Sequence, residues 1–203
     1  AIVTGMAVLG TMASSMVVAY SFARLEWPGK KFFFGILIST MMLPDVVTLV
    51  PRFIMFKSFD WIDTFFPLIV PYWTGISALY VFLAVQFLKG LPIELEEAAL
   101  IDGASRLQII IQVILPLSKP VLATIAVFAL LQHYNDFMGP LIYLNSLDNW
   151  TLALGVRGLN SSYASNWELV FAASTMMLTP VFLLFVFAQR FFVQGIAMTG
   201  FGG

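Results

Sequence analysis

The sequence contains no cysteine, one histidine and little charge. The lack of cysteine excludes disulfides, thiol nucleophiles and thiolate metal sites, and the lone His133 excludes a histidine metal cluster. A phosphate-binding G-x-x-x-x-G-K-[ST] loop is also missing, because Gly29-Lys30-Lys31 has no glycine upstream at the required spacing. We therefore expect no cofactor and no ATP site on this chain. The net charge of −1 gives no indication of a nucleic-acid partner.

Hydrophobic sequence dominates instead: 60% of the 203 residues are hydrophobic and 10% are charged. Soluble domains carry about 25% charged residues, so this composition indicates a membrane protein in contact with lipid. A hydrocarbon core of about 30 Å is crossed by roughly 20 apolar residues in a helix. Segments of this kind lie at about 2–22, 32–54, 65–88, 121–143 and 169–188. The chain is thus predicted to be one all-α domain, residues 1–203, a polytopic membrane helical bundle.

The longest polar stretch is the loop at 89–120, between the third and fourth predicted spans. Pro92 suits the first position of a helix, where its missing N–H costs nothing. Glu94, Glu96 and Glu97 fall in or near the first turn of that helix, where negative charge meets the positive end of the helix dipole. Gly103 is placed to end the helix in a left-handed conformation. A short helix that follows a membrane span is predicted here.

A second short helix follows in the same loop. Ser105 can cap its start, and Pro116 and Pro120 can end it. In the first helix, a face of mostly small residues allows a partner to approach the backbone closely; it comprises Leu95, Ala98, Ala99 and Asp102. Two interpretations remain open from the residues alone. The loop is either a solvated connection between spans or the docking site of a water-side partner.

The spacing within this loop resembles a known motif. Glu97-Ala98-Ala99, then Gly103, then Leu115-Pro116 resemble the EAA loop of permease subunits of binding-protein-dependent ABC importers. The one departure is Val113, where the family pattern has isoleucine. The longer forms ELEEAALIDGAS and YSFARLEWPGKKFFF resemble the carbohydrate branch of that family. The resemblance implies the transmembrane domain of a type I importer that takes up a carbohydrate by alternating access.

The same resemblance implies partners and roles. The loop is the coupling element that sits in a cleft of a separate ATP-binding subunit, present as a dimer, which binds the ATP. A second permease subunit and an extracytoplasmic solute-binding protein complete the importer. The implied coupling residues are Glu97, Ala98, Ala99, Asp102, Gly103, Leu115 and Pro116. Family members have a further N-terminal span, so this sequence is expected to lack the first span.

Orientation is predicted from the basic residues, which favour the cytoplasmic side of a membrane. One side carries seven, namely Arg24, Lys30, Lys31, Lys89, Arg106, Lys119 and Arg190. The other side carries three, namely Arg52, Lys57 and Arg157. This asymmetry predicts that loop 89–120 and the C-terminus are cytoplasmic. The resemblance implies that the membrane is the inner membrane of a prokaryote.

Charged residues inside membrane spans are costly, and they often mark a transport pathway. Asp45 follows Pro44 in the second span, and Tyr134, Asn135 and Asp136 form a polar cluster in the fourth. These four residues are candidates for the translocation pathway. The alternative is that they form hydrogen bonds with other helices and fix the bundle.

Other functions can be drawn from the same residues. Gly75-Ile76-Ser77-Ala78 has the G-x-S-x form found in membrane serine proteases, and Ser77 with His133 would make its dyad. Asp45 with Asp136 would suit an aspartyl protease, but the sequence has no Gly-x-Gly-Asp. A passive channel is a third possibility. None of the three needs a docking loop, so we expect a permease that is not itself an enzyme; a solute such as a glycerophosphate is the alternative to a sugar.

Overall fold

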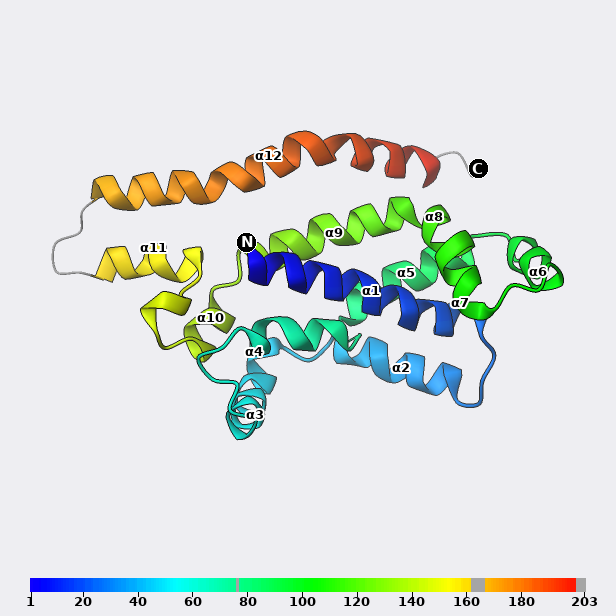
Figure 1. The fold of residues 1–203 in the computed structure, drawn as a ribbon, viewed down its shortest axis with the longest axis horizontal. Coiled ribbons are helices and arrows are strands. Elements are labelled where there is room, and N and C mark those ends of the chain that lie inside the picture. The colour runs from blue at the N-terminus through cyan, green and yellow to red at the C-terminus, as the bar shows by residue number, and fades with distance from the viewer. Residues whose placement is uncertain (76, 162–166, 200–203) are drawn as a thin grey trace.

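The computed structural model describes residues 1–75, 77–161 and 167–199, and these residues form helices and no strand. Figure 1 shows the helices lying mostly lengthwise in an elongated bundle. The elements are α1 (Ile2–Arg24), α2 (Lys30–Thr40), α3 (Asp45–Ser58), α4 (Phe66–Ile69), η1 (Val70–Trp73), α5 (Ala78–Lys89), α6 (Glu94–Ile101), α7 (Arg106–Ile109), η2 (Ile110–Ile114), α8 (Leu115–Leu117), α9 (Lys119–Tyr134), α10 (Met138–Tyr143), η3 (Leu147–Asn149), α11 (Leu152–Ser161) and α12 (Trp167–Thr199). The predicted all-α fold is confirmed.

The core lies where α1 packs against α5 and α9. Ala19, Ala84 and Ala129 are fully buried there, one from each helix. Small residues at these positions let the helix backbones approach closely, which is how membrane helices gain packing energy. Leu88 and Ile125 fill the remaining space and are also fully buried. Helices α1, α5 and α9 therefore form a tightly packed central unit.

Large apolar side chains lie on the outside as well as in the core. On α2, Phe32 is 68% exposed and Ile36 is 47% exposed, and none of its residues is buried. A soluble protein rarely leaves such a helix uncovered, whereas lipid accommodates it. Helix α1 and the segment Phe66–Lys89 are long and apolar enough to cross a membrane. The bent pairs formed by α2 with α3 and by Arg106–Leu117 with α9 also qualify, if each counts as one span.

The second predicted span, 32–54, differs from expectation because it is not one continuous helix. Helices α2 and α3 meet at an angle of 100° around a break that ends at Pro44. Proline disfavours a helical conformation in the residue before it, and Pro44 itself is extended. Pro51 lies inside α3 without ending it. Asp45 therefore sits in the first turn of a new helix, not in the middle of a span.

The third and fourth predicted spans are also interrupted. The start of the segment 65–88 consists of the short elements α4 and η1, which contain Pro67 and Pro71 near their first positions. Helix α9 ends at Tyr134, and α10 begins at Met138. Asp136 lies in the break and its Oδ1 accepts a hydrogen bond from the Gly139 N–H at 3.1 Å. The prediction that Asp136 lies within a helix was wrong, because its side chain caps α10 instead.

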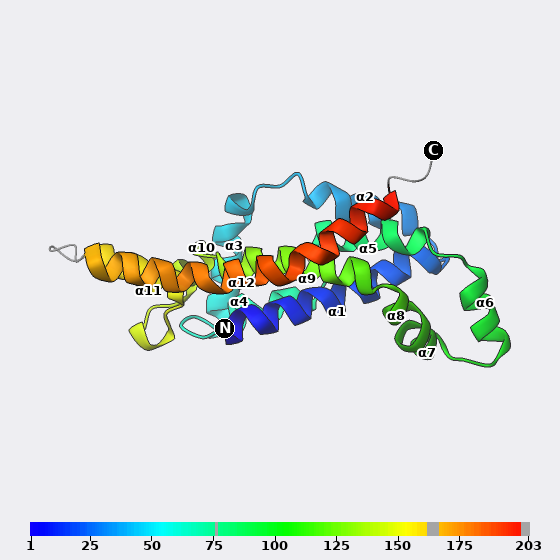
Figure 2. The ribbon, with the colours of Figure 1, turned by 90° about the horizontal axis from the view of Figure 1, so that it is seen from above.

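The fifth predicted span, 169–188, falls within α12. Residues 200–203, which we expect on the cytoplasmic side, lie outside the described part of the chain. Figures 1 and 2 agree on the two ends of the bundle. Helices α6 and α7 project from one end, near the C-terminal end of α1. Helices α3, α10 and α11 lie toward the other, near the N-terminal end of α1.

Candidate functional site

The projecting end of the bundle carries the predicted coupling loop. The first predicted helix is present as α6, with Glu94, Glu96 and Glu97 in its first turn. Gly103 has a φ of +83°, the left-handed conformation that glycine adopts without strain. The Ala104 N–H donates to the Ala99 carbonyl at 2.9 Å, which closes the last turn. The prediction that Gly103 ends this helix is confirmed.

A capping box begins the second helix of the loop. The Ser105 hydroxyl accepts a hydrogen bond from the Gln108 N–H, and the Gln108 side chain accepts one from the Ser105 N–H at 2.7 Å. The helix runs from Arg106 to Leu117 through the π-helical stretch η2. Pro116 has no N–H to donate to the carbonyl four residues earlier, which accounts for the wider turn just before it. The predicted cap at Ser105 is therefore confirmed, and Pro116 lies in the last turns of this helix.

Several of the predicted coupling residues face outward. Glu97, Ala98 and Asp102 are exposed, and so are Gly103 and Pro116. Ala99 and Leu115 are half-buried. Several large apolar side chains of the loop are also exposed, among them Leu95 by 42%, Leu100 by 39%, Ile101 by 86% and Leu107 by 66%. Exposed apolar side chains on a projecting, polar loop are suited to contact with a partner.

Sequence reasoning missed the role of Glu96, which it grouped with the other acids of α6. Glu96 is buried, with 3% of its surface exposed. Its Oε1 lies 2.8 Å from Nε of Arg24, and its Oε2 accepts a hydrogen bond from the Tyr20 hydroxyl at 3.0 Å. The Arg24 guanidinium also donates to the Leu91 carbonyl at 2.7 Å. No signal in the sequence distinguished Glu96 from the neighbouring acids, because both of its partners lie far away in the sequence, on α1.

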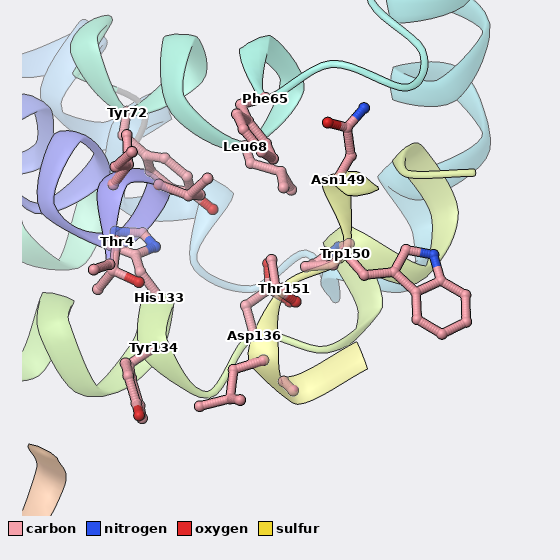
Figure 3. Close-up of a pocket in the computed structure, with 16 residues that line it drawn as sticks. Thr4, Phe65, Leu68, Tyr72, His133, Tyr134, Asp136, Asn149, Trp150 and Thr151 are labelled. Carbon is pink, nitrogen blue, oxygen red and sulfur yellow. The ribbon is translucent and has the colours of Figure 1, made fainter. Parts of the chain in front are cut away.

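A cavity of about 330 Å³ lies at the opposite end of the bundle. Figure 3 shows Thr4, Tyr72 and His133 on its left side and Asn149, Trp150 and Thr151 on its right. Tyr134 and Asp136, two of the four predicted pathway residues, line it as well. Aromatic rings next to hydrogen-bonding groups are suited to a small polar ligand.

The other two predicted pathway residues have different surroundings. The Asn135 side chain is exposed and donates to the Leu131 carbonyl at 2.9 Å. Asp45 is 91% exposed and pairs with Arg52 on the same helix, at 3.2 Å. The structure thus brings Tyr134 and Asp136 together in one cavity and places Asp45 on the surface of α3.

His133 is held by neighbours other than Ser77. Its Nε2 lies 3.3 Å from the Thr11 hydroxyl, and its ring packs on Tyr72 with 4.1 Å between centroids. Ser77 precedes the first turn of α5. Within the described residues, no group of three or more His, Cys, Asp or Glu side chains is placed to hold a metal ion. The contacts of His133 therefore favour a structural role over a serine–histidine dyad.

Comparison with known proteins assigns the chain to a family. The family described as "Binding-protein-dependent transport system inner membrane component" matches residues 9–198. The chain belongs to this family. It is a multi-pass membrane permease, and the relatives named below are transport permeases, not enzymes. The protease alternatives are thereby set aside.

Individual relatives are similar over nearly the whole chain. The arabinooligosaccharides transport system permease protein AraQ of Halalkalibacterium halodurans is 34% identical, over 97% of this chain and 69% of AraQ. The melibiose/raffinose/stachyose import permease protein MelC of Bacillus subtilis is 32% identical, over 97% of this chain and 71% of MelC. The sn-glycerol-3-phosphate transport system permease protein UgpE of Pectobacterium atrosepticum is 31% identical, over 93% of this chain and 67% of UgpE.

The fold has a counterpart among solved structures. A bacterial ABC transporter involved in the import of the acidic polysaccharide alginate matches with a TM-score of 0.80 and 22% identity, over 94% of this permease and 73% of the solved chain. The permease thus has the fold of an ABC importer subunit.

Proposed function

We propose that this permease is the transmembrane subunit of an ATP-driven importer for a carbohydrate, and that α6 couples it to a separate ATP-binding subunit. The observation that carries the proposal is the exposure of large apolar side chains on the projecting helices α6 and α7, among them Leu95, Ile101 and Leu107. Exposure of such side chains to water is unfavourable until a partner covers them. ATP is bound by that partner, since this chain has no phosphate-binding loop.

The remaining partners follow from the family. A second permease subunit completes the pathway, and an extracytoplasmic solute-binding protein delivers the substrate to the end of the bundle where the cavity lies. Closure of an ATP-bound dimer would displace α6 and open the pathway to the outside, so that access alternates between the two sides. This arrangement requires loop 89–120 and the C-terminus to be cytoplasmic, as the basic residues predict.

The cavity favours a sugar over a phosphate. Among the residues that line it, the charged side chain is the Asp136 carboxylate, and Tyr72, Tyr134 and Trp150 contribute aromatic rings to the same lining. A carboxylate accepts hydrogen bonds from sugar hydroxyls and repels an anion, and aromatic rings pack on the apolar faces of sugars. Relatives named for arabinooligosaccharides and for melibiose, raffinose and stachyose agree with this, although UgpE is named for sn-glycerol-3-phosphate. The glycerophosphate alternative rests on relatives of the UgpE type.

Substitutions on α6 test the proposed coupling. Glu97→Lys reverses an exposed charge on α6, and Gly103→Val forces a branched residue into a left-handed conformation at a cost of about 1–2 kcal/mol. Either change is expected to leave membrane insertion intact and to weaken attachment of the ATP-binding subunit or uncouple ATP hydrolysis from uptake. Asp148→Lys, which alters an exposed acid in η3 at the other end of the bundle, is the matched control.

The measurement is co-purification of the ATP-binding subunit, followed by sugar uptake and ATP hydrolysis in the same proteoliposomes. Labelled oligosaccharide and labelled glycerol 3-phosphate are supplied in parallel to separate the two substrate classes. Normal subunit attachment together with normal coupled uptake in both α6 variants would exclude the coupling role of this loop. Uptake of glycerol phosphate without uptake of any oligosaccharide would exclude the sugar assignment.

A further inference from the structure

One acid of α6 faces the bundle while its neighbours face water. Glu96 is 3% exposed, whereas Glu94 and Glu97 are exposed. The ion pair of Glu96 with Arg24 is almost completely buried, with 4% and 7% of the two side chains exposed. The Tyr20 hydroxyl donates a second contact to the same carboxylate, at 3.0 Å. A buried charge of this kind is costly to separate from its partner, so Glu96 and Arg24 have to move together.

The same arginine holds the segment that leads into α6. Its guanidinium donates to the Leu91 carbonyl at 2.7 Å while its Nε lies 2.8 Å from Glu96. Both the entry to α6 and its first turn are therefore attached to the last turn of α1. The C-terminal end of α1 thus holds the projecting loop at several points, although α1 is not adjacent to the loop in the sequence.

The other end of α1 reaches the cavity. Thr4 lines the cavity, and the Thr11 hydroxyl lies 3.3 Å from Nε2 of His133, which lines it too. The Ser14 hydroxyl donates to the carbonyl of Tyr72, a third lining residue, at 2.8 Å. Between Thr4 and Arg24, α1 is one uninterrupted helix without proline, which spans about 30 Å at 1.5 Å per residue. It connects the projecting loop and the cavity directly.

The connections that follow the chain are interrupted. Between α5 and α6 the residues Gly90–Ile93 lie outside both helices. On the other side, the helix Arg106–Leu117 contains the π-helical stretch η2, and it meets α9 at 78° at a junction with Pro116 on one side and Pro120 on the other. Helices bend most readily at prolines and π-helical turns of this type. A displacement of α6 is therefore passed on less directly along the chain than through α1.

We propose that the Glu96–Arg24 pair transmits the movement of α6 to α1, and that α1 carries it to the cavity. The proposal rests on the proposed function for the source of the movement, an ATP-binding subunit that displaces α6. Glu96, Arg24 and Tyr20 are positioning residues in this scheme. If α6 shifted alone, two charges would be left unpaired in a buried site, so α1 has to follow. The positions of Thr4 and of the Thr11–His133 contact in the cavity wall then depend on the nucleotide state of the ATP-binding subunit.

The absence of cysteine allows a direct test in the assembled complex. Thr4→Cys places a single thiol in the cavity wall, and the complex is isolated through an affinity tag on this permease. Its rate of labelling by a biotin maleimide is measured without nucleotide and with Mg²⁺, ATP and vanadate. We expect the rate to change with nucleotide in the Thr4→Cys complex. We expect Glu96→Gln or Arg24→Ala to abolish that change while the ATP-binding subunit stays attached and hydrolyses ATP.

The controls separate transmission from a merely structural role. Glu94→Gln removes an exposed acid from the same turn of α6 and should leave the nucleotide-dependent change intact. Glu96→Gln keeps the shape of the side chain and the Tyr20 hydrogen bond. It therefore still tests transmission through the Glu96–Arg24 pair if the Arg24→Ala complex fails to assemble. The double exchange Arg24→Glu with Glu96→Arg restores opposite charges and should recover part of the change.

Each remaining outcome has a definite meaning. A nucleotide-dependent change that persists in Glu96→Gln and in an assembled Arg24→Ala complex would overturn transmission through α1 while leaving the proposed function standing. Loss of the ATP-binding subunit from the Glu96→Gln complex would also overturn it, because Glu96 would then act in docking. A Thr4→Cys complex that hydrolyses ATP without any change in labelling would overturn the transmission as well. Failure to recover any ATP-binding subunit with the Thr4→Cys permease would instead overturn the proposed function, and the transmission with it.

Discussion

The carboxylate of Asp63 accepts hydrogen bonds from both the backbone N–H and the hydroxyl of Ser146, 83 positions further along the chain. The Asn145 N–H donates to the same Oδ1 at 2.9 Å, and the Asn149 side chain donates to the Asp63 carbonyl at 2.8 Å. Asp63 has a φ of +63°, which aspartate tolerates better than most residues. One side chain therefore joins the loop after α3 to the loop before η3, at the end of the bundle where the cavity lies.

The first prediction concerns the hydrogen bonds of Asp63 at low pH. Hydrogen bonds from the Ser146 side chain and from the backbone N–H groups of Ser146 and Asn145 lower the pKa of Asp63 to about 2, from an ordinary value of 3.8. Because the pKa is lower in the folded protein, the contribution of Asp63 is fully present above pH 3.8 and is lost as the pH falls toward 2. We expect the amides of Asn145 and Ser146 to lose protection from hydrogen exchange across that range.

The measurement is the protection factor of these two amides in detergent micelles as a function of pH. Asp63→Ala should abolish their protection already at neutral pH, because no acceptor remains. Asp60→Ala is the matched control, since Asp60 lies in the same loop and also has a positive φ, of 54°. Equal protection in the protein and in Asp63→Ala would contradict the assignment of Asp63 as the acceptor that joins the loops.

The second prediction concerns two glycines of α1. A Cβ on Gly10 would meet the Trp73 indole, 2.5 Å from its Nε1, whereas a Cβ on Gly5 would meet nothing within 4 Å. Gly10→Ala should therefore displace the indole, break its hydrogen bond to the Met6 carbonyl and destabilise the protein by about 1–3 kcal/mol. Gly5→Ala should be neutral or stabilise it by about 0.5–1 kcal/mol, because alanine restricts the unfolded chain and favours helix.

Thermal unfolding of both variants in the same detergent measures this difference. The two substitutions add the same methyl group to the same helix, so helix propensity and detergent effects cancel in the comparison. A lower midpoint for Gly5→Ala than for Gly10→Ala would contradict the close packing of α1 against η1.

The third prediction is the orientation in the membrane. Single cysteines at Ile101 in α6 and at Leu147 in η3 place thiols at sites that are 86% and 73% exposed, at opposite ends of the bundle. A membrane-impermeant maleimide applied to intact cells should label Leu147→Cys and not Ile101→Cys, because the basic residues favour a cytoplasmic loop 89–120. Lysed cells provide the control in which both sites are labelled. The reverse pattern in intact cells would refute both the orientation and a cytoplasmic partner.

Local features of the fold could be predicted from the sequence. The cap at Gly103 and the capping box at Ser105 depend on residues within one or two turns of each other, so the sequence contains all the information needed. The apolar segments were recognisable because hydrophobicity over roughly 20 residues is a property of a single segment, although the bends within them were not. These predictions needed no knowledge of which helices pack together.

Contacts between distant segments could not be predicted in this way. In the sequence, Glu96 could not be distinguished from its exposed neighbours, because Tyr20, whose hydroxyl donates a hydrogen bond to it, is 76 positions away. The same limit applied to Asp63, whose partners lie beyond residue 140. The predicted position of Asp136, in the middle of a span, was wrong for a related reason. The length of a hydrophobic segment does not show that one helix ends at Tyr134 and that the Asp136 side chain accepts an N–H in the first turn of the next.

The last prediction concerns Asp136, for which a structural and a transport role make different demands. Its Oδ1 accepts the Gly139 N–H at 3.1 Å, and an asparagine at this position can accept the same hydrogen bond. Asp136→Asn therefore keeps the cap of α10 and removes the charge from the cavity wall. If the carboxylate binds sugar hydroxyls, uptake should fall about tenfold or more, the value expected for losing a hydrogen bond to a charged group, while assembly and ATP hydrolysis persist. Asp148→Asn, an exposed acid outside the cavity lining, should leave uptake unchanged. Normal uptake by an assembled Asp136→Asn complex would instead assign Asp136 to the cap alone.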